Sequence, residues 1–125
     1  MNIKKLLEGL GSNNPHVSAA AMRTVLDNPN DAAMRIALVK ALTHKNHLVR
    51  GSSAIAAGRL LINEAVPHLI PLLKDDDLRT RCFAAAALGK IGDRRAIAPL
   101  KKLAMDKEHE YQYKLVVGAL RKLTP

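Results

Sequence analysis

RCFAAAALGKIGDRRAIAPL, residues 81–100, is the stretch of sequence that decides the fold. In its first half, small apolar residues recur at the three- and four-residue spacing of one helix face: Ala84, Ala85, Ala87, Leu88 and Ile91. We expect Gly89 and Gly92 to bring this helix to its end, and Asp93 to cap the next one. Ile97 and Leu100 then mark the buried side of that second helix. The stretch therefore predicts two short helices joined by a tight turn.

The same pattern occurs 31 residues earlier in the chain. Residues 46–75, NHLVRGSSAIAAGRLLINEAVPHLIPLLKD, align with residues 77–106, DLRTRCFAAAALGKIGDRRAIAPLKKLAMD. A single helix hairpin cannot bury both of its apolar faces, so neighbouring hairpins are expected to stack. We predict one all-α domain over residues 1–125, an α-α superhelix of about four helix pairs, in which residues 46–76 and 77–107 are the clearest repeats.

The flanking segments follow the pattern more loosely. Residues 14–26 resemble a first helix and residues 31–42 its partner, so residues 1–45 are interpreted as divergent repeats and an N-terminal cap. Residues 108–125 are interpreted as a C-terminal capping helix. Three prolines fall in second helices, where an interior proline is costly, and we expect them to kink the helix or delay its start: Pro67, Pro71 and Pro99.

Composition places the chain among small globular proteins. The 125 residues are 48% hydrophobic but only 2% aromatic, which suits one core of closely packed helices. No apolar run reaches the length of a membrane span and no signal peptide is visible, so a cytoplasmic protein is predicted. The net charge of +9 favours an anionic partner, such as an acidic protein or a nucleic acid.

The repeat resembles the HEAT-like repeat of the phycobilisome-lyase type, whose signature combines Arg, Ala-Ala, Ala-Leu-Gly, Ile-Gly-Asp, Ala-Val and Leu at fixed spacing. Residues 81–100 match it almost throughout, and residues 46–75 match it less well because Ile62-Asn63 replaces the Gly-Asp turn. The resemblance implies a helical solenoid. It also implies that Asp and Arg side chains of adjacent first helices form a stabilising ladder, a role that falls here to Arg50, Asp77 and Arg81.

No catalytic constellation is visible in the sequence. His109-Glu110 is the only His-Glu pair, whereas the metal-dependent hydroxylases among the relatives implied by this resemblance hold iron with several such pairs. His44 and His47 lack a nearby carboxylate or thiolate to complete a metal site. Cys82 has no assignable base. We therefore predict that the chain is not an enzyme and uses no metal or other cofactor.

Stacking the second helices by the 31-residue repeat predicts a basic surface. Lys40, Pro71 and Lys102 then share one row, and His68 and Pro99 lie one turn earlier. In HEAT-like stacks the second helices line the concave wall, so we predict a partner-binding face on that wall. Its predicted residues are Lys40, His68, Lys101 and Lys102, with Lys74, Arg94 and Arg95 towards the edges.

These observations predict a non-enzymatic protein-interaction module or assembly factor with an acidic partner. One alternative is binding of a nucleic-acid backbone by the basic face. Another, implied by the resemblance, is an accessory role in bilin attachment to, or removal from, phycobiliproteins. The two ends of a short solenoid also offer a route to a homodimer, near Leu6 or near Leu123.

Overall fold

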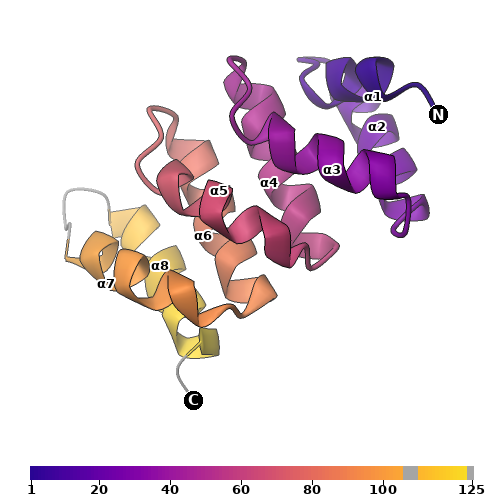
Figure 1. The fold of residues 1–125 in the computed structure, drawn as a ribbon. Coiled ribbons are helices and arrows are strands. Elements are labelled where there is room, and N and C mark those ends of the chain that lie inside the picture. Colours follow the sequence, from indigo (N-terminus) through magenta and orange to yellow (C-terminus); the bar gives the residue numbers. More distant parts are fainter. Residues whose placement is uncertain (106–109, 124–125) are drawn as a thin grey trace.

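The computed structural model describes residues 1–105 and 110–123, and throughout these residues the regular structure is helical. Figure 1 shows the helices stacked in two rows, with α3, α5 and α7 in front of α4, α6 and α8. The predicted all-α solenoid is thereby confirmed. The α-helices are α1 Ile3–Leu10, α2 Pro15–Asp27, α3 Ala32–Ala41, α4 His47–Arg59, α5 Val66–Leu72, α6 Leu78–Ile91, α7 Ile97–Ala104 and α8 Glu110–Leu123.

Short polar side chains start the helices. Each accepts a hydrogen bond from an otherwise unpaired N–H group of the first turn, as N-cap residues do. The Asp77 carboxylate, for example, accepts from the Thr80 N–H at 2.9 Å and from the Thr80 hydroxyl at 2.8 Å. The same role is filled by Asn2, Asn14, Asp31 and Asn46 at the starts of α1, α2, α3 and α4.

The row of first helices is held at close range by glycine. Gly58 is buried inside α4, and a Cβ atom at this position would lie 2.9 Å from the Ala87 Cα of α6. Gly89 is likewise buried inside α6, against Ala119 of α8. Gly92 ends α6 in the left-handed conformation, with φ of 78°, as expected. Gly89, however, does not end the helix; it allows the next helix to approach.

The turn after α4 corrects the alignment of the two repeats. Leu61 has a φ of 53° and so adopts the left-handed conformation that Gly92 adopts 31 residues later. The residues that stand in place of the Gly-Asp turn are therefore Leu61 and Ile62, one position earlier than expected. Ile62 is buried at 1% exposure, so an apolar contact replaces the capping carboxylate of Asp93.

The prolines of the second helices are placed largely as expected. A 3-10 turn precedes each of α5 and α7, at Asn63–Ala65 and at Arg94–Ala96. Pro67 and Pro99 consequently fall in the first turns of their helices, where the missing N–H has no helical partner. Pro71 lies inside α5, which is only seven residues long.

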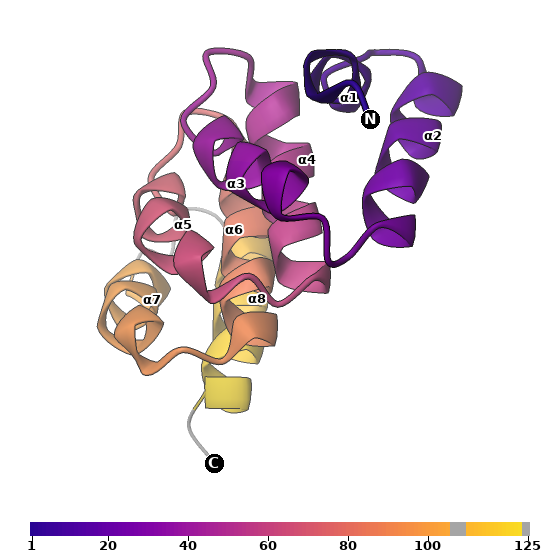
Figure 2. The same cartoon turned by 45° about the vertical axis from the view of Figure 1, so that its right-hand side comes forward.

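The N-terminal segment departs from the repeat pattern. Helix α1 lies between α2 and α4: the Ser52 hydroxyl donates to the Leu10 carbonyl oxygen at 2.9 Å, and a Cβ on Gly9 would lie 2.9 Å from the Ala21 Cβ. Figure 2 shows α2 standing apart from α3, so these two helices do not form the hairpin predicted for residues 14–42. Among the described residues, no helix has the length and apolar character needed to cross a membrane.

Candidate binding surface

The exposed side of α3, α5 and α7, which we call the second-helix wall, carries two hollows. The α3–α5 hollow has a volume of about 630 Å³ and contains the apolar side chains of Ile36, Val39 and Ile62. Ile36 is 58% exposed, which is unusual for a side chain of its size and character. Charged or titratable side chains also line this hollow: Arg35, Lys40, Glu64 and His68.

The α5–α7 hollow repeats this arrangement with a different set of residues. It has a volume of about 610 Å³, and its charged lining residues are Lys74 and Lys102. Its other lining residues are apolar, namely Ile70, Pro71, Leu73, Ala98, Pro99 and Leu103.

The two hollows occupy equivalent places in consecutive repeats. Val39 of the first corresponds to Ile70 of the second, and Lys40 corresponds to Pro71, each at the 31-residue repeat offset. Each hollow thus combines an apolar surface with lysine ammonium groups. Only the α3–α5 hollow also has an acidic lining residue, Glu64.

The residues predicted for the partner surface separate into groups. Lys40 and His68 line the first hollow and Lys74 and Lys102 the second. Lys101 is exposed on α7 but lines neither hollow, and the same holds for Arg94.

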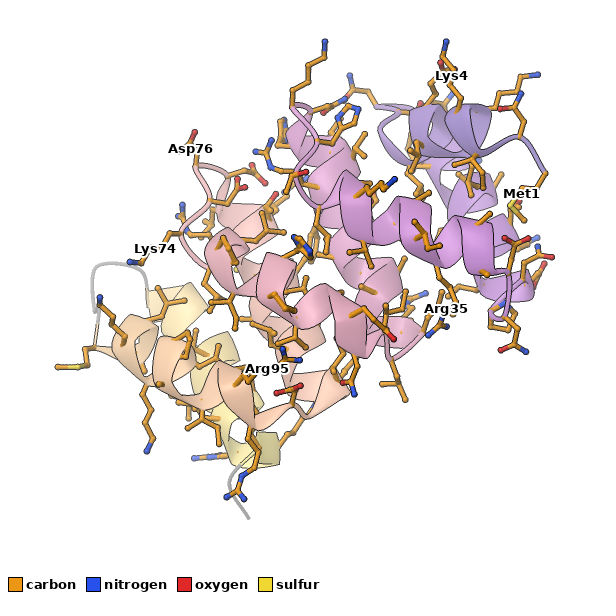
Figure 3. The ribbon with its side chains drawn as sticks, in the orientation of Figure 1. Met1, Lys4, Arg35, Lys74, Asp76 and Arg95 are labelled. Carbon is orange, nitrogen blue, oxygen red and sulfur yellow. The ribbon has the colours of Figure 1, made fainter. Side chains whose placement is uncertain are left out.

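Arg95 is engaged close to its own helix. Its guanidinium lies 2.7 Å from the Asp93 carboxylate, and the hydrogen bonds from Arg95 lower the pKa of Asp93 to about 2. In Figure 3 Arg35 and Lys74 lie well apart, beyond opposite ends of α5, so the basic residues are spread along the wall.

Three lining residues of the α3–α5 hollow were not predicted: Arg35, Ile36 and Ile62. The sequence carried one signal for them, an isoleucine and an arginine side by side in an otherwise amphipathic helix. That signal does not reveal which side of α3 faces solvent, because the answer depends on how α4 and α5 pack against it.

The ladder between repeats has a different carboxylate from the one predicted. The Arg50 guanidinium donates to both carboxylate oxygens of Asp75, at 2.8 and 3.0 Å, and to the backbone carbonyl oxygen of His44 at 2.9 Å. Arg81 donates to the backbone carbonyl oxygen of Asp75 at 2.6 Å. Asp77 is occupied as the cap of α6 and lies 3.6 Å from the His47 imidazole. The ion pair that links the repeats is therefore Arg50–Asp75.

The remaining candidate reactive groups are dispersed. Cys82 is buried, and this burial raises the pKa of its thiol. The His44 imidazole accepts a hydrogen bond from the Asn46 N–H at 3.0 Å. Across residues 1–105 and 110–123, no three His, Cys, Asp or Glu side chains gather as a metal site would require. His109 of the predicted His-Glu pair lies outside the described residues.

Comparison with known proteins gives the wall its context. The sequence pattern of HEAT repeats matches residues 37–121, more than half of the chain. The bilin biosynthesis protein PecE of Nostoc sp. PCC 7120 is 38% identical over 76 residues, which are 60% of this chain and 30% of PecE. The resemblance to the phycobilisome-lyase type of repeat is thus confirmed.

Two solved structures share the fold over 98% of this chain. One is the complex of CpcE and CpcF of phycocyanin lyase from Nostoc sp. PCC 7120, with a TM-score of 0.75, 23% identity and 53% of the matched chain covered. The other is human deoxyhypusine hydroxylase in complex with glycerol, with a TM-score of 0.74, 25% identity and 43% covered. The present chain thus spans about a third to a half of the proteins it matches.

These relatives overturn one prediction. The chain was expected to be non-enzymatic, because no catalytic constellation is visible in its sequence. That prediction is wrong, since its relatives are a bilin biosynthesis protein and a chain of phycocyanin lyase. The physical reason for the error is that a solenoid lyase subunit carries no local motif by which its activity could be read.

Proposed function

This chain belongs to the HEAT repeat family, and from that premise we propose that it is a subunit of a bilin-lyase type of enzyme, which it joins by binding a protein partner through the second-helix wall. The relatedness to PecE supports the lyase assignment. The CpcE–CpcF complex supports the idea that such a chain works together with a second protein. Because the chain spans 30% of PecE, it supplies only part of what that protein contains.

The observation that carries the proposal is the pair of hollows on the wall. Each exposes apolar side chains that other parts of the described chain do not cover, and each is bordered by lysine ammonium groups. Exposed apolar surface with a polar rim is typical of protein-binding sites. Such a surface fits a partner segment whose apolar side chains are flanked by carboxylates.

The charge balance of the wall indicates the chemistry of that partner. Arg35, Lys40, Lys74 and Lys102 border the hollows, against the single carboxylate of Glu64. Complementary charge speeds encounter and suppresses association with basic surfaces. The partner surface is accordingly acidic.

Affinity capture with the wild-type chain as bait in an extract of its source organism tests the proposal. Recovered proteins are identified by mass spectrometry, and those that carry covalently bound bilin are detected by zinc-induced fluorescence on a denaturing gel. We expect the wild-type bait to recover a bilin-bearing protein or a second lyase chain. A bait with Lys40→Glu and Lys102→Glu should lose it.

The matched control is Lys101→Glu, which makes the same charge change on α7 outside both hollows. Equal recovery by the Lys40→Glu/Lys102→Glu bait and the control would contradict a role for the wall. A second assay adds the purified chain to the captured partner and free bilin and follows covalent attachment; no change in attachment would contradict the lyase assignment. An electrophoretic mobility shift across a salt series tests the alternative of nucleic-acid binding, since phosphate contacts weaken steeply with salt.

A further inference from the structure

The second-helix wall has a periodic shape that restricts the kind of partner segment it fits. Helix α5 forms the crest between the two hollows, with α3 on one side and α7 on the other (Figure 1). The exposed side chains of α5 are Pro67, His68 and Pro71. Two of these three are short, rigid prolines, so the crest is low and a rod-shaped segment can cross it.

The distance between the hollows follows from helix packing. Adjacent packed helices lie about 8–10 Å apart, and successive hollows of a repeat are separated by one such step. In an α-helix, residues i and i+7 lie on one face and are about 10.5 Å apart. In a β-strand, residues on one face are about 6.6 or 13 Å apart, and neither value matches the step.

We propose that the second-helix wall binds an acidic amphipathic α-helix of the protein partner, laid across α5 with one large apolar side chain in each hollow. This inference rests on the proposed function, because it names the element of the partner that the wall receives. Ile36 and Val39 contact the first apolar side chain, and Ala98 and Leu103 contact the second. Small residues of the bound helix pass over Pro71.

Charge sets the composition of the flanks of that helix. Lys40 borders the first hollow, and Lys74 and Lys102 border the second. Carboxylates one turn away from each apolar anchor then meet these ammonium groups, and such rim pairs contribute mainly to specificity and association rate. The apolar anchors carry most of the affinity, as buried side chains do at the centres of interfaces.

A displayed library of amphipathic helices tests this inference directly. Helices of about 21 residues, with their exposed positions randomised, are selected on the purified full chain. The recovered helices are then synthesised and titrated by fluorescence anisotropy. We expect them to carry large apolar residues at i and i+7 with Asp or Glu beside them.

Substitutions in the hollows distinguish this site from the rest of the surface. Ala98→Phe fills the α5–α7 hollow from an exposed position, and Ile36→Asp removes an exposed apolar side chain from the α3–α5 hollow. Each should weaken helix binding about tenfold or more, while the control Lys101→Glu should leave it within about twofold. Circular dichroism and the melting temperature confirm that each variant remains folded.

The outcomes are decisive and separable from those for the proposed function. Failure to recover helices, or helices that bind the Ala98→Phe and Ile36→Asp variants as tightly as the wild type, would overturn the inference. If that occurs while the natural partner is still lost on the Lys40→Glu/Lys102→Glu bait, the proposed function stands and only the helical nature of the bound segment is rejected.

Discussion

Single residues show where consecutive repeats obey the same rules and where they do not. Ser53 is fully buried in α4, and its hydroxyl has no hydrogen-bond partner among the described residues. The equivalent position 31 residues later is Ala84, which is also fully buried. In the following turn, Leu61 adopts the backbone conformation that suits glycine at position 92. The repeat at residues 46–76 is thus locally less favourable than the one that follows it.

Ser53→Ala is expected to stabilise the protein. The change removes a buried unpaired hydroxyl and introduces a better helix former, so the free energy of unfolding should rise by about 1 kcal/mol. Chemical denaturation followed by circular dichroism measures this change. The reverse substitution, Ala84→Ser, should lower stability, and a loss of stability on Ser53→Ala would reveal a hidden partner for the hydroxyl.

The left-handed turns make a second pair of predictions. Leu61→Gly relieves a conformation that costs a side-chain-bearing residue about 1–2 kcal/mol, offset by about 0.5–1 kcal/mol of chain entropy. The net gain in unfolding free energy should therefore be about 0.5–1 kcal/mol. Gly92→Ala should lose about 1–2 kcal/mol although no atom lies within 4 Å of the added Cβ. Thermal denaturation of both variants checks these opposite signs.

At the scale of helices, packing distance and inter-repeat links hold the stack together. Gly58 and Gly89 let α4, α6 and α8 approach closely, and the contacts are between backbone and Cβ atoms. On the opposite side, α3, α5 and α7 leave hollows between them. The stability of the stack and the shape of the candidate site therefore depend on different rows of helices.

Gly58→Ala is expected to destabilise the interface between α4 and α6. The added Cβ would lie 2.9 Å from the Ala87 Cα, so the helices must separate, at a cost of about 1–3 kcal/mol. Gly118→Ala is the matched control, because Gly118 is exposed in α8 with nothing within 4 Å of an added Cβ. That control should gain about 0.5–1 kcal/mol from helix propensity. Urea denaturation distinguishes the two signs.

The Arg50–Asp75 pair predicts how the stack responds to acid. Burial alone would raise the pKa of Asp75, but hydrogen bonds from the Arg50 guanidinium and the Asp77 N–H hold it below its usual value. A carboxylate with a lowered folded-state pKa stabilises the fold above its unfolded pKa of about 3.9, and this contribution is lost as pH falls through the folded pKa. Stability should be flat from about pH 7 to 5 and fall below about pH 4.

Arg50→Ala tests that account. It leaves the largely buried Asp75 carboxylate without its guanidinium, which should lower the unfolding free energy at pH 7 by about 2–3 kcal/mol. Burial then dominates the pKa of Asp75, so acid unfolding should begin at higher pH than in the wild type. An unchanged acid midpoint, measured by circular dichroism, would contradict the assignment of this pair as the link between repeats.

The whole molecule is a basic stack whose ends are partly closed. The net charge of +9 lies on a chain in which α1 and α8 cover the two ends of the described stack (Figure 1). Leu6 and Leu123, which were expected to leave apolar surface at the ends, are only 7% and 6% exposed. The packing of α1 between α2 and α4 closes the N-terminal end in a way that the repeat pattern does not contain.

This closure bears on the oligomeric state. With both end leucines buried and a net charge of +9 opposing self-association, we expect the isolated chain to be monomeric at micromolar concentration. Size-exclusion chromatography with light scattering measures the mass in solution. A dimer that persists in high salt would instead support the end-to-end association predicted from the sequence.

The sequence by itself determined the helices, their order and their repeat, because caps, apolar spacing and glycine act over a few residues: Asp77, Asp93 and Gly92 lie at the helix boundaries they predicted. The tertiary structure alone decided which carboxylate pairs with Arg50, that α1 inserts beside α4, and that Lys102 lines a hollow while Lys101 does not. The reason is physical. Each of these outcomes depends on the distance and rotation between helices that are remote in sequence, and a local pattern fixes neither.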